Sequence, residues 1–177
     1  MGLFISCLVQ LQQDYYNIKG IILPMPSMIA IDLETTGLNA DEDAIIEIGA
    51  VRFNGTRIED TWSSLINPRR PIPPFITQLT GISNSMVKNA PLLSDVIQDV
   101  ITFVGDLPVL GQNISFDLGF LRPAGACLNN TEVDTYEMAA VLMPTASRYN
   151  LSALAQQLGI LLRSEEHTSE LQSPNTI

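Results

Sequence analysis

The sequence has few basic residues, few aromatic residues and a single histidine. Its 177 residues contain nine Lys and Arg against nineteen Asp and Glu, which leaves a formal net charge of -10. This balance excludes a protein that holds nucleic acid through a broad basic face. A chain of this charge that acts on a polyanion needs another source of positive charge, and a bound divalent cation is the simplest one.

Cysteine and long hydrophobic runs are also scarce. Cys7 and Cys127 are the two cysteines, too few for a disulfide framework, and no metal-binding Cys/His spacing occurs, so we expect a reducing, cytoplasmic setting. The longest apolar stretch, residues 21–31, contains Pro24 and Pro26 and is shorter than the ~20 residues that span a membrane. The first residues lack the pattern of a signal peptide. We expect no membrane partner.

Apolar residues make up 46% of the chain, which is enough for the core of one domain. Their pattern predicts a mixed α/β sheet, in which an antiparallel three-stranded meander precedes parallel strands flanked by helices. Strands are expected at residues 28–32, 44–53, 57–66, 108–110 and 132–134. Helices are expected at residues 91–104, 116–121, 136–142 and 151–158, and a proline-rich loop at 67–74. Asn54 and Gly55 predict the first hairpin.

The two ends of the chain differ from its middle. Residues 1–24 show no clear period and are interpreted as an N-terminal extension, with an ordinary extra strand or helix as the alternative. Residues 163–173 are similar to a translated sequencing adapter. We therefore expect one domain at residues 25–162, a natural sequence that ends near Leu162, and an artefactual or disordered tail at 163–177.

Two carboxylates follow the first apolar run. Asp32 ends the expected strand at 28–32 and Glu34 follows two residues later; in a strand conformation, residues with this spacing project from the same face. Side chains with this arrangement repel one another unless a cation lies between them, and oxygen ligands suit Mg²⁺ or Mn²⁺. Taken alone, the pair is equally compatible with a solvated strand end.

A third carboxylate follows the expected strand at 108–110. Asp117 lies where that strand is followed by a helix, a position at which α/β folds collect functional groups. The alternative is a first-turn acid stabilised by the helix dipole. The acidic run at residues 41–43 is interpreted as a solvated loop, and Arg69 and Arg70 as surface loop residues.

Taken together, these segments resemble the DnaQ-like (DEDDh) branch of the 3′→5′ exonucleases. This branch includes the proofreading epsilon subunit of DNA polymerase III and the exonuclease domain of DinG-type helicases. The resemblance covers residues 28–160, and its motif-like segments are 31–38, 45–51, 79–82, 113–121, 134–135 and 149–160. It implies a ribonuclease-H-like fold and hydrolysis of phosphodiester bonds at DNA 3′ ends.

The resemblance also implies a site with two Mg²⁺ or Mn²⁺ ions. Asp32 would bridge both ions, Glu34 would bind the ion on the side of the nucleophile, and Asp117 would help to hold the second. Bound cations would then supply the positive charge that the composition lacks.

The same resemblance implies a binding site for the terminal nucleotide. Thr35, Thr36 and Gly37 would meet this nucleotide, Leu38 would wedge against the last bases, and Asn113 would contribute from the second motif. The partner is therefore expected to be a nucleic acid 3′ end, DNA rather than RNA. A polymerase subunit or a fused helicase is the further partner that the family implies.

The sequence departs from the family pattern at two places. Gln112 stands where the family often has His, and the third motif, His-x-x-x-x-Asp, is missing. The only histidine, His167, lies in the adapter-like tail and has Gln172 five residues later. We therefore expect a fragment with weak or no activity. A non-catalytic module that binds nucleic acid or a polymerase, and an exonuclease of the same fold that acts on RNA, are the alternatives.

Overall fold

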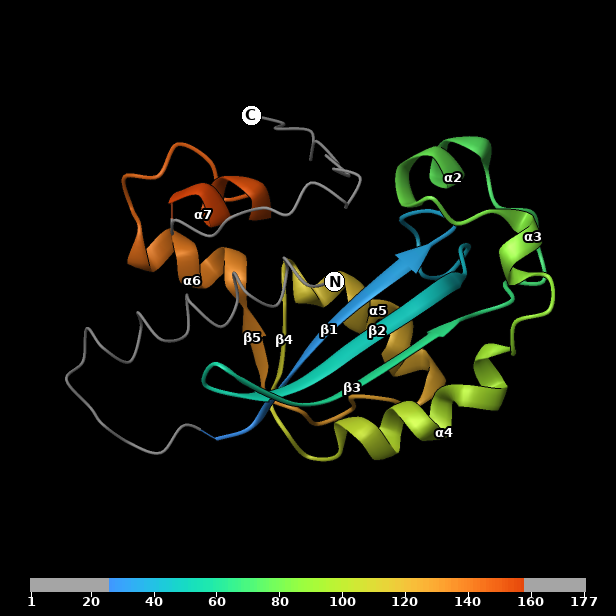
Figure 1. Ribbon diagram of the computed structural model, residues 1–177, viewed down its shortest axis with the longest axis horizontal. Coiled ribbons are helices and arrows are strands. Elements are labelled where there is room, and N and C mark those ends of the chain that lie inside the picture. Colours follow the sequence, from blue (N-terminus) through green and yellow to red (C-terminus); the bar gives the residue numbers. More distant parts are fainter. Residues whose placement is uncertain (1–25, 158–177) are drawn as a thin grey trace.

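The computed structural model describes residues 26–157, whose strands form one five-stranded sheet (Figure 1). The strands are β1 (Met28–Thr35), β2 (Ile45–Asn54), β3 (Arg57–Leu65), β4 (Val109–Gly111) and β5 (Glu132–Asp134). Their spatial order is β3-β2-β1-β4-β5, with β1, β2 and β3 antiparallel and β4 and β5 parallel to β1. This arrangement confirms the predicted mixed sheet. The predicted N-terminal extension and the tail lie outside the described residues.

The helices of the described residues connect and cover these strands. They are α2 (Pro74–Thr80), α3 (Asn84–Val87), α4 (Leu93–Val104), α5 (Ile114–Leu121), the 3₁₀ helix η1 (Arg122–Ala124), α6 (Thr135–Leu142) and α7 (Leu151–Gln157). The short helices α2 and α3 were not predicted. Helix α4 begins at Leu93 rather than at Pro91, and Leu158, the predicted end of the last helix, lies outside the described residues. None of the helices within residues 26–157 combines the length and apolar character that crossing a membrane requires.

The alternation of side chains along β1 divides the core into two parts. Ile29, Ile31 and Leu33 project from one face and pack with the buried residues of α4 and α5. Met28 and Ala30 project from the other face, where Met138 of α6 packs against their cluster. Because the period of a strand is two, Asp32 and Glu34 continue the face of Met28 and Ala30. The hydrophobic pattern of β1 thus determines the face on which the two carboxylates lie.

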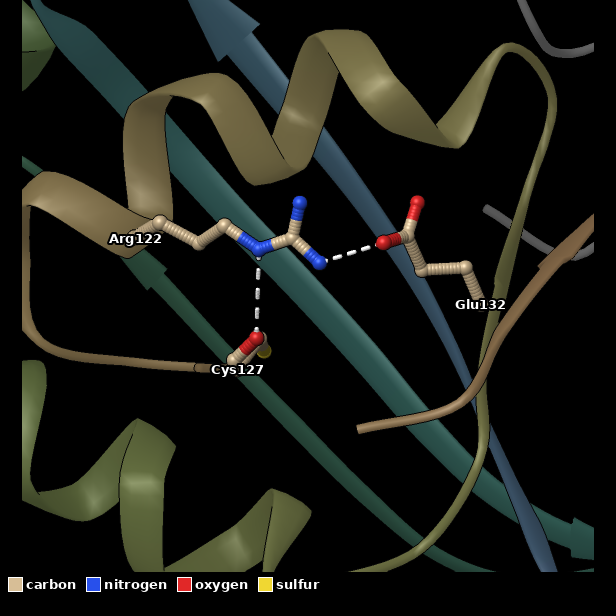
Figure 2. A network of polar contacts seen from close by, with 3 residues as sticks. All are labelled: Arg122, Cys127 and Glu132. Atoms are coloured by element: carbon tan, nitrogen blue, oxygen red, sulfur yellow. Dashed lines mark hydrogen bonds and ion pairs between the residues drawn. The ribbon is translucent and has the colours of Figure 1, made fainter. Parts of the chain in front are cut away.

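The C-terminal end of α5 is joined to β5 by Arg122 (Figure 2). The Arg122 Nε donates to the Cys127 carbonyl oxygen at 3.4 Å, and its Nη2 forms an ion pair with Glu132. Both side chains of the ion pair are partly exposed, so we expect it to contribute only about 0–1 kcal/mol to folding. Through these two contacts, Arg122 links Cys127, in the segment between α5 and β5, to Glu132 at the start of β5.

Candidate active site

Asp32 and Glu34 lie at the C-terminal end of β1, as the sequence predicted. In the antiparallel register with β2, Asp32 is opposite Gly49 and Glu34 is opposite Glu47. Residues directly opposite one another share a face of the sheet, so Glu47 adds a third carboxylate to this face. The sequence analysis assigned no role to Glu47. The only available signal was its place in a family-like segment, because the register of β2 against β1 was not known.

Asp117 is held at β1 by a backbone amide that the neighbouring strand leaves without an acceptor. Ile29 N donates to the Pro108 carbonyl oxygen, so the odd-numbered amides of β1 point toward β4. Strand β4 ends at Gly111, which leaves the Leu33 amide without a strand partner. The Asp117 Oδ1 accepts this hydrogen bond at 3.0 Å, and the side chain is buried. The structure therefore brings Asp117 to the backbone between Asp32 and Glu34.

Burial and mutual repulsion raise the pKa of all three predicted carboxylates. Burial, with a smaller contribution from the charge of Glu47, raises the pKa of Asp32 to about 6. Burial and the charges of Asp32 and Glu47 raise the pKa of Glu34 to about 7. The pKa of Asp117 rises to about 8 because of burial and the charge of Asp32, although the Leu33 amide opposes this shift. The site is therefore a poor environment for three negative charges in the absence of a cation.

The chemistry of these groups fits a divalent cation. All three are carboxylates, and no lysine or arginine of the described residues forms an ion pair with them. Hard cations such as Mg²⁺ prefer oxygen ligands and retain several waters, so they do not require a closed protein cage. As they stand within residues 26–157, no three or more Asp, Glu, His or Cys side chains are grouped so that they could hold a metal ion.

The loop after β1 is organised by its own polar side chains. The Thr35 hydroxyl donates to the Gly37 carbonyl oxygen at 2.6 Å, and the Thr36 hydroxyl donates to Asp43 Oδ1 at 3.0 Å. Thr36 also accepts from the Ala44 amide at 3.0 Å. Both threonines are buried, with 7% and 3% of their surface exposed. Their hydroxyls therefore shape the loop from within and are engaged there.

Asp43 is a structural residue of this loop and not the solvated acid that the sequence suggested. Besides accepting from Thr36, its carboxylate accepts from the Asn39 amide at 3.0 Å. Gly37 lies directly against this carboxylate, since a Cβ built at Gly37 would be 2.6 Å from the Asp43 Cγ. The close approach accounts for glycine at position 37. Leu38, the next residue, is 71% exposed.

Substitution of Gly37 by alanine is expected to lower the free energy of unfolding by about 1–3 kcal/mol. The new methyl group would displace the Asp43 carboxylate and thereby break its hydrogen bonds to Thr36 and Asn39. Gly119→Ala is the matched control, because its Cβ would meet only the Ala40 Cβ at 4.0 Å and alanine favours helix α5. Urea unfolding measures both variants, and equal stability of the two would contradict this interpretation of the loop.

The segment that precedes α5 contains the other predicted residues. Asn113 is exposed and takes the left-handed conformation, with φ 56° and ψ 47°. Gln112 bridges two segments, because its Nε2 donates to the Tyr149 carbonyl oxygen at 2.8 Å and its Oε1 accepts from the Thr135 hydroxyl at 2.6 Å. At the position where the family often has histidine, glutamine thus joins the end of β4 to α6 and to the segment before α7.

Comparison with known proteins agrees with this arrangement. A family model described as Exonuclease (RNase_T) matches residues 29–170. The PolC-type DNA polymerase III of Bacillus subtilis is 37% identical over 153 residues, which are 83% of this chain and 11% of that protein. The 3′-5′ exonuclease DinG of Staphylococcus aureus is 35% identical over 151 residues, or 82% of this chain and 17% of that protein. The chain therefore spans a small part of these relatives.

Solved structures show the same fold. Exonuclease X in complex with 5′ overhanging duplex DNA has a TM-score of 0.65 and 28% identity, with 77% of this chain and 75% of that chain covered. A product-bound exonuclease I has a TM-score of 0.66 at 16% identity, covering 80% of this chain and 40% of that chain, and bears on the fold alone. These likenesses confirm the ribonuclease-H-like fold and the family resemblance drawn from the motifs.

Proposed function

We propose that this chain, which belongs to the Exonuclease family, is a metal-dependent 3′→5′ exonuclease domain that acts on DNA 3′ ends. The observation that carries the proposal is the hydrogen bond from the Leu33 amide to Asp117. It holds a carboxylate from α5 beside two carboxylates of β1, and no lysine or arginine within residues 26–157 forms an ion pair with them. The similarity to DinG and to a DNA complex of exonuclease X supports a nucleic acid substrate.

Exonucleases of this type use divalent metal ions, and Asp32, Glu34 and Asp117 are the residues that we propose hold Mg²⁺ or Mn²⁺ here. When bound, such ions lower the pKa of a water molecule and neutralise charge on the phosphoryl group. The protein contributes carboxylates on rigid elements, because two are on β1 and the third is fixed by the Leu33 amide.

The loop after β1 is the proposed binding surface for the terminal nucleotide. Thr35 and Thr36 direct their hydroxyls into the loop, so they would act by shaping the backbone around Gly37. The exposed Leu38 side chain would pack against the last base, a contact that tolerates any sequence. Asn113 is exposed at the start of α5 and is the proposed contact from the second motif.

Binding of Mn²⁺ is expected to raise the melting temperature of the chain. A ligand that binds only the native state stabilises it by about 2.7 kcal/mol at a hundredfold excess over its dissociation constant. Asp32→Asn removes a charged oxygen ligand and should weaken this stabilisation. Thermal unfolding with and without Mn²⁺, at constant ionic strength, measures the effect.

Asp99→Asn is the matched control, because Asp99 is exposed on α4 and its loss changes the net charge equally. The Mn²⁺ effect should persist in this variant. A wild-type melting temperature that does not respond to millimolar Mn²⁺ would contradict the proposed site and favour a non-catalytic binding module. Parallel assays with 3′-labelled DNA and RNA test the proposed preference for DNA.

A further inference from the structure

The N-terminus of α5 is held by a side chain from another strand. Asn113, the N-cap residue, makes no side-chain capping bond to its own helix. Instead, the Asp134 carboxylate accepts from the Asn113 amide at 3.2 Å through Oδ1 and from the Ile114 amide at 3.1 Å through Oδ2. The first amides of a helix have no partner within the helix, so these bonds replace a missing cap.

The same carboxylate also caps α6. Its Oδ1 accepts from the Tyr136 amide at 2.8 Å. Asp134 is the last residue of β5 and pairs with Gly111, the last residue of β4. One carboxylate thus joins the N-termini of the two helices that follow neighbouring parallel strands, and its negative charge is favourable at both helix dipoles.

We propose that Asp134 is a positioning residue for Asp117, an inference that rests on the proposed metal-dependent function. Asp117 lies one turn beyond Ile114, so fixing the first amides of α5 fixes the distance of the Asp117 carboxylate from β1. With the helix held in this position, the Asp117 carboxylate accepts the hydrogen bond from the Leu33 amide at 3.0 Å.

Other contacts limit how α5 can be placed. A Cβ at Gly111 would lie 2.7 Å from the Ile114 Cδ1 and 3.2 Å from the Ile31 carbonyl oxygen, so the start of the helix is close against both β4 and β1. At the other end of the helix, Arg122 contacts Glu132, the first residue of β5 (Figure 2). Helix α5 is therefore attached to β5 at both ends, and Asp134 provides the attachment nearer to Asp117.

Amide hydrogen exchange in the full chain tests the positioning directly. In Asp134→Ala, we expect the Leu33 amide to lose protection, because its acceptor Asp117 is released. The Ile29 amide, which donates to the Pro108 carbonyl oxygen on the same edge of β1, should keep its protection. A general loss of stability would lower the protection of both amides, so the ratio of the two separates positioning from a merely structural role.

Mn²⁺ affinity, measured by titration calorimetry, provides the second readout. Residues that orient metal ligands affect metal affinity by about 10- to 100-fold when they are replaced. We expect a loss of this size in Asp134→Ala and a smaller loss in Asp134→Asn, which retains one acceptor oxygen and remains informative if the alanine variant does not fold.

Asp95→Ala is the matched control, because Asp95 accepts from the Leu92 amide and so caps the start of a different helix, α4. Its Mn²⁺ affinity should remain within about twofold of wild type, well below the change expected for a residue that orients ligands. Equal loss of protection at Leu33 and Ile29, or an affinity loss in Asp134→Ala no larger than in Asp95→Ala, would overturn the proposal. A wild-type chain that binds no Mn²⁺ would instead contradict the proposed function, while the Leu33 and Ile29 comparison still decides the positioning role.

Discussion

Replacing residues 163–177 with a C-terminal segment that carries His-x-x-x-x-Asp is expected to raise the metal-dependent release of mononucleotides from DNA 3′ ends by about 10²- to 10⁴-fold. This range is the usual contribution of a general base, and the only histidine of the sequence, His167, is followed five residues later by Gln172 rather than Asp. Both positions lie outside the described residues. The measurement is the rate of mononucleotide release with Mg²⁺ or Mn²⁺ and with EDTA.

Substitutions in the extended chain test whether the same site performs the reaction. Asp32→Ala should abolish the release, whereas Asp99→Asn on the exposed face of α4 should leave it unchanged. If the original chain already digests DNA as fast as the extended chain, and Asp32→Ala stops both, the expectation of weak or no activity is wrong. His167→Ala in the original chain would then be the next variant to measure.

Local patterns in the sequence were sufficient to predict the first strand and its carboxylates. The run that begins at Met28 is apolar and ends on Asp32 and Glu34, and the strand period of two places these acids on one face whatever the rest of the chain does. Asn54 and Gly55 likewise predict the turn between β2 and β3 from two adjacent residues. Features of this kind depend on neighbours in the sequence and need no knowledge of the tertiary structure.

Helix α2 was missed because it offers almost no periodic pattern. It is seven residues long, and Ile76 is its only buried residue. Its start coincides with Pro73 and Pro74 in a segment interpreted as a loop, although proline is well suited to the first helical position. A single buried residue cannot establish a period of 3.6, so hydrophobic periodicity could not distinguish this helix from the preceding loop.

The roles of Asp43, Glu47 and Asp134 depend on contacts between segments that are distant in the sequence or on the exact course of a loop. Glu47 reaches the face of Glu34 only in the observed register of β1 and β2. Asp134 holds amides that are about twenty residues earlier in the chain. Acidic residues in these positions look like ordinary surface residues in the sequence. The roles of Asp43 and Asp134 become evident only when the backbone amides that they accept from are known. The role of Glu47 becomes evident only when the register of β1 and β2 is known.

In the absence of divalent cations, the chain is expected to become less stable as the pH rises from 5 to 9. The pKa values of Asp32, Glu34 and Asp117 are raised from ordinary values of 3.8, 4.5 and 3.8 to about 6, 7 and 8. Between the ordinary and the raised pKa values, the folded protein binds more protons than the unfolded chain, so the free energy of unfolding falls with increasing pH. The stability that these three protonated carboxyl groups contribute is fully present below about pH 4 and is lost as the pH rises through 6 to 8.

The size of this loss is expected to be a few kcal/mol in total, since one unit of pKa shift corresponds to about 1.4 kcal/mol and the three groups share one site. Urea unfolding in EDTA at several pH values measures it. Asp117→Asn should flatten the pH dependence, because the amide retains an acceptor for the Leu33 amide but has no charge to bury. The exposed Asp99→Asn should leave the dependence as in wild type.

Mn²⁺ should restore most of the lost stability at pH 8 and have little effect at pH 5, because protons and the cation compete for the same carboxylates. This difference separates a cation bound at the buried site from one that screens the net charge of -10, since a screening ion would stabilise the wild type and both variants alike. Stability that increases from pH 5 to 9 in EDTA would mean that the three carboxylates have neutralising partners. The reason for assigning them to a metal would then be lost.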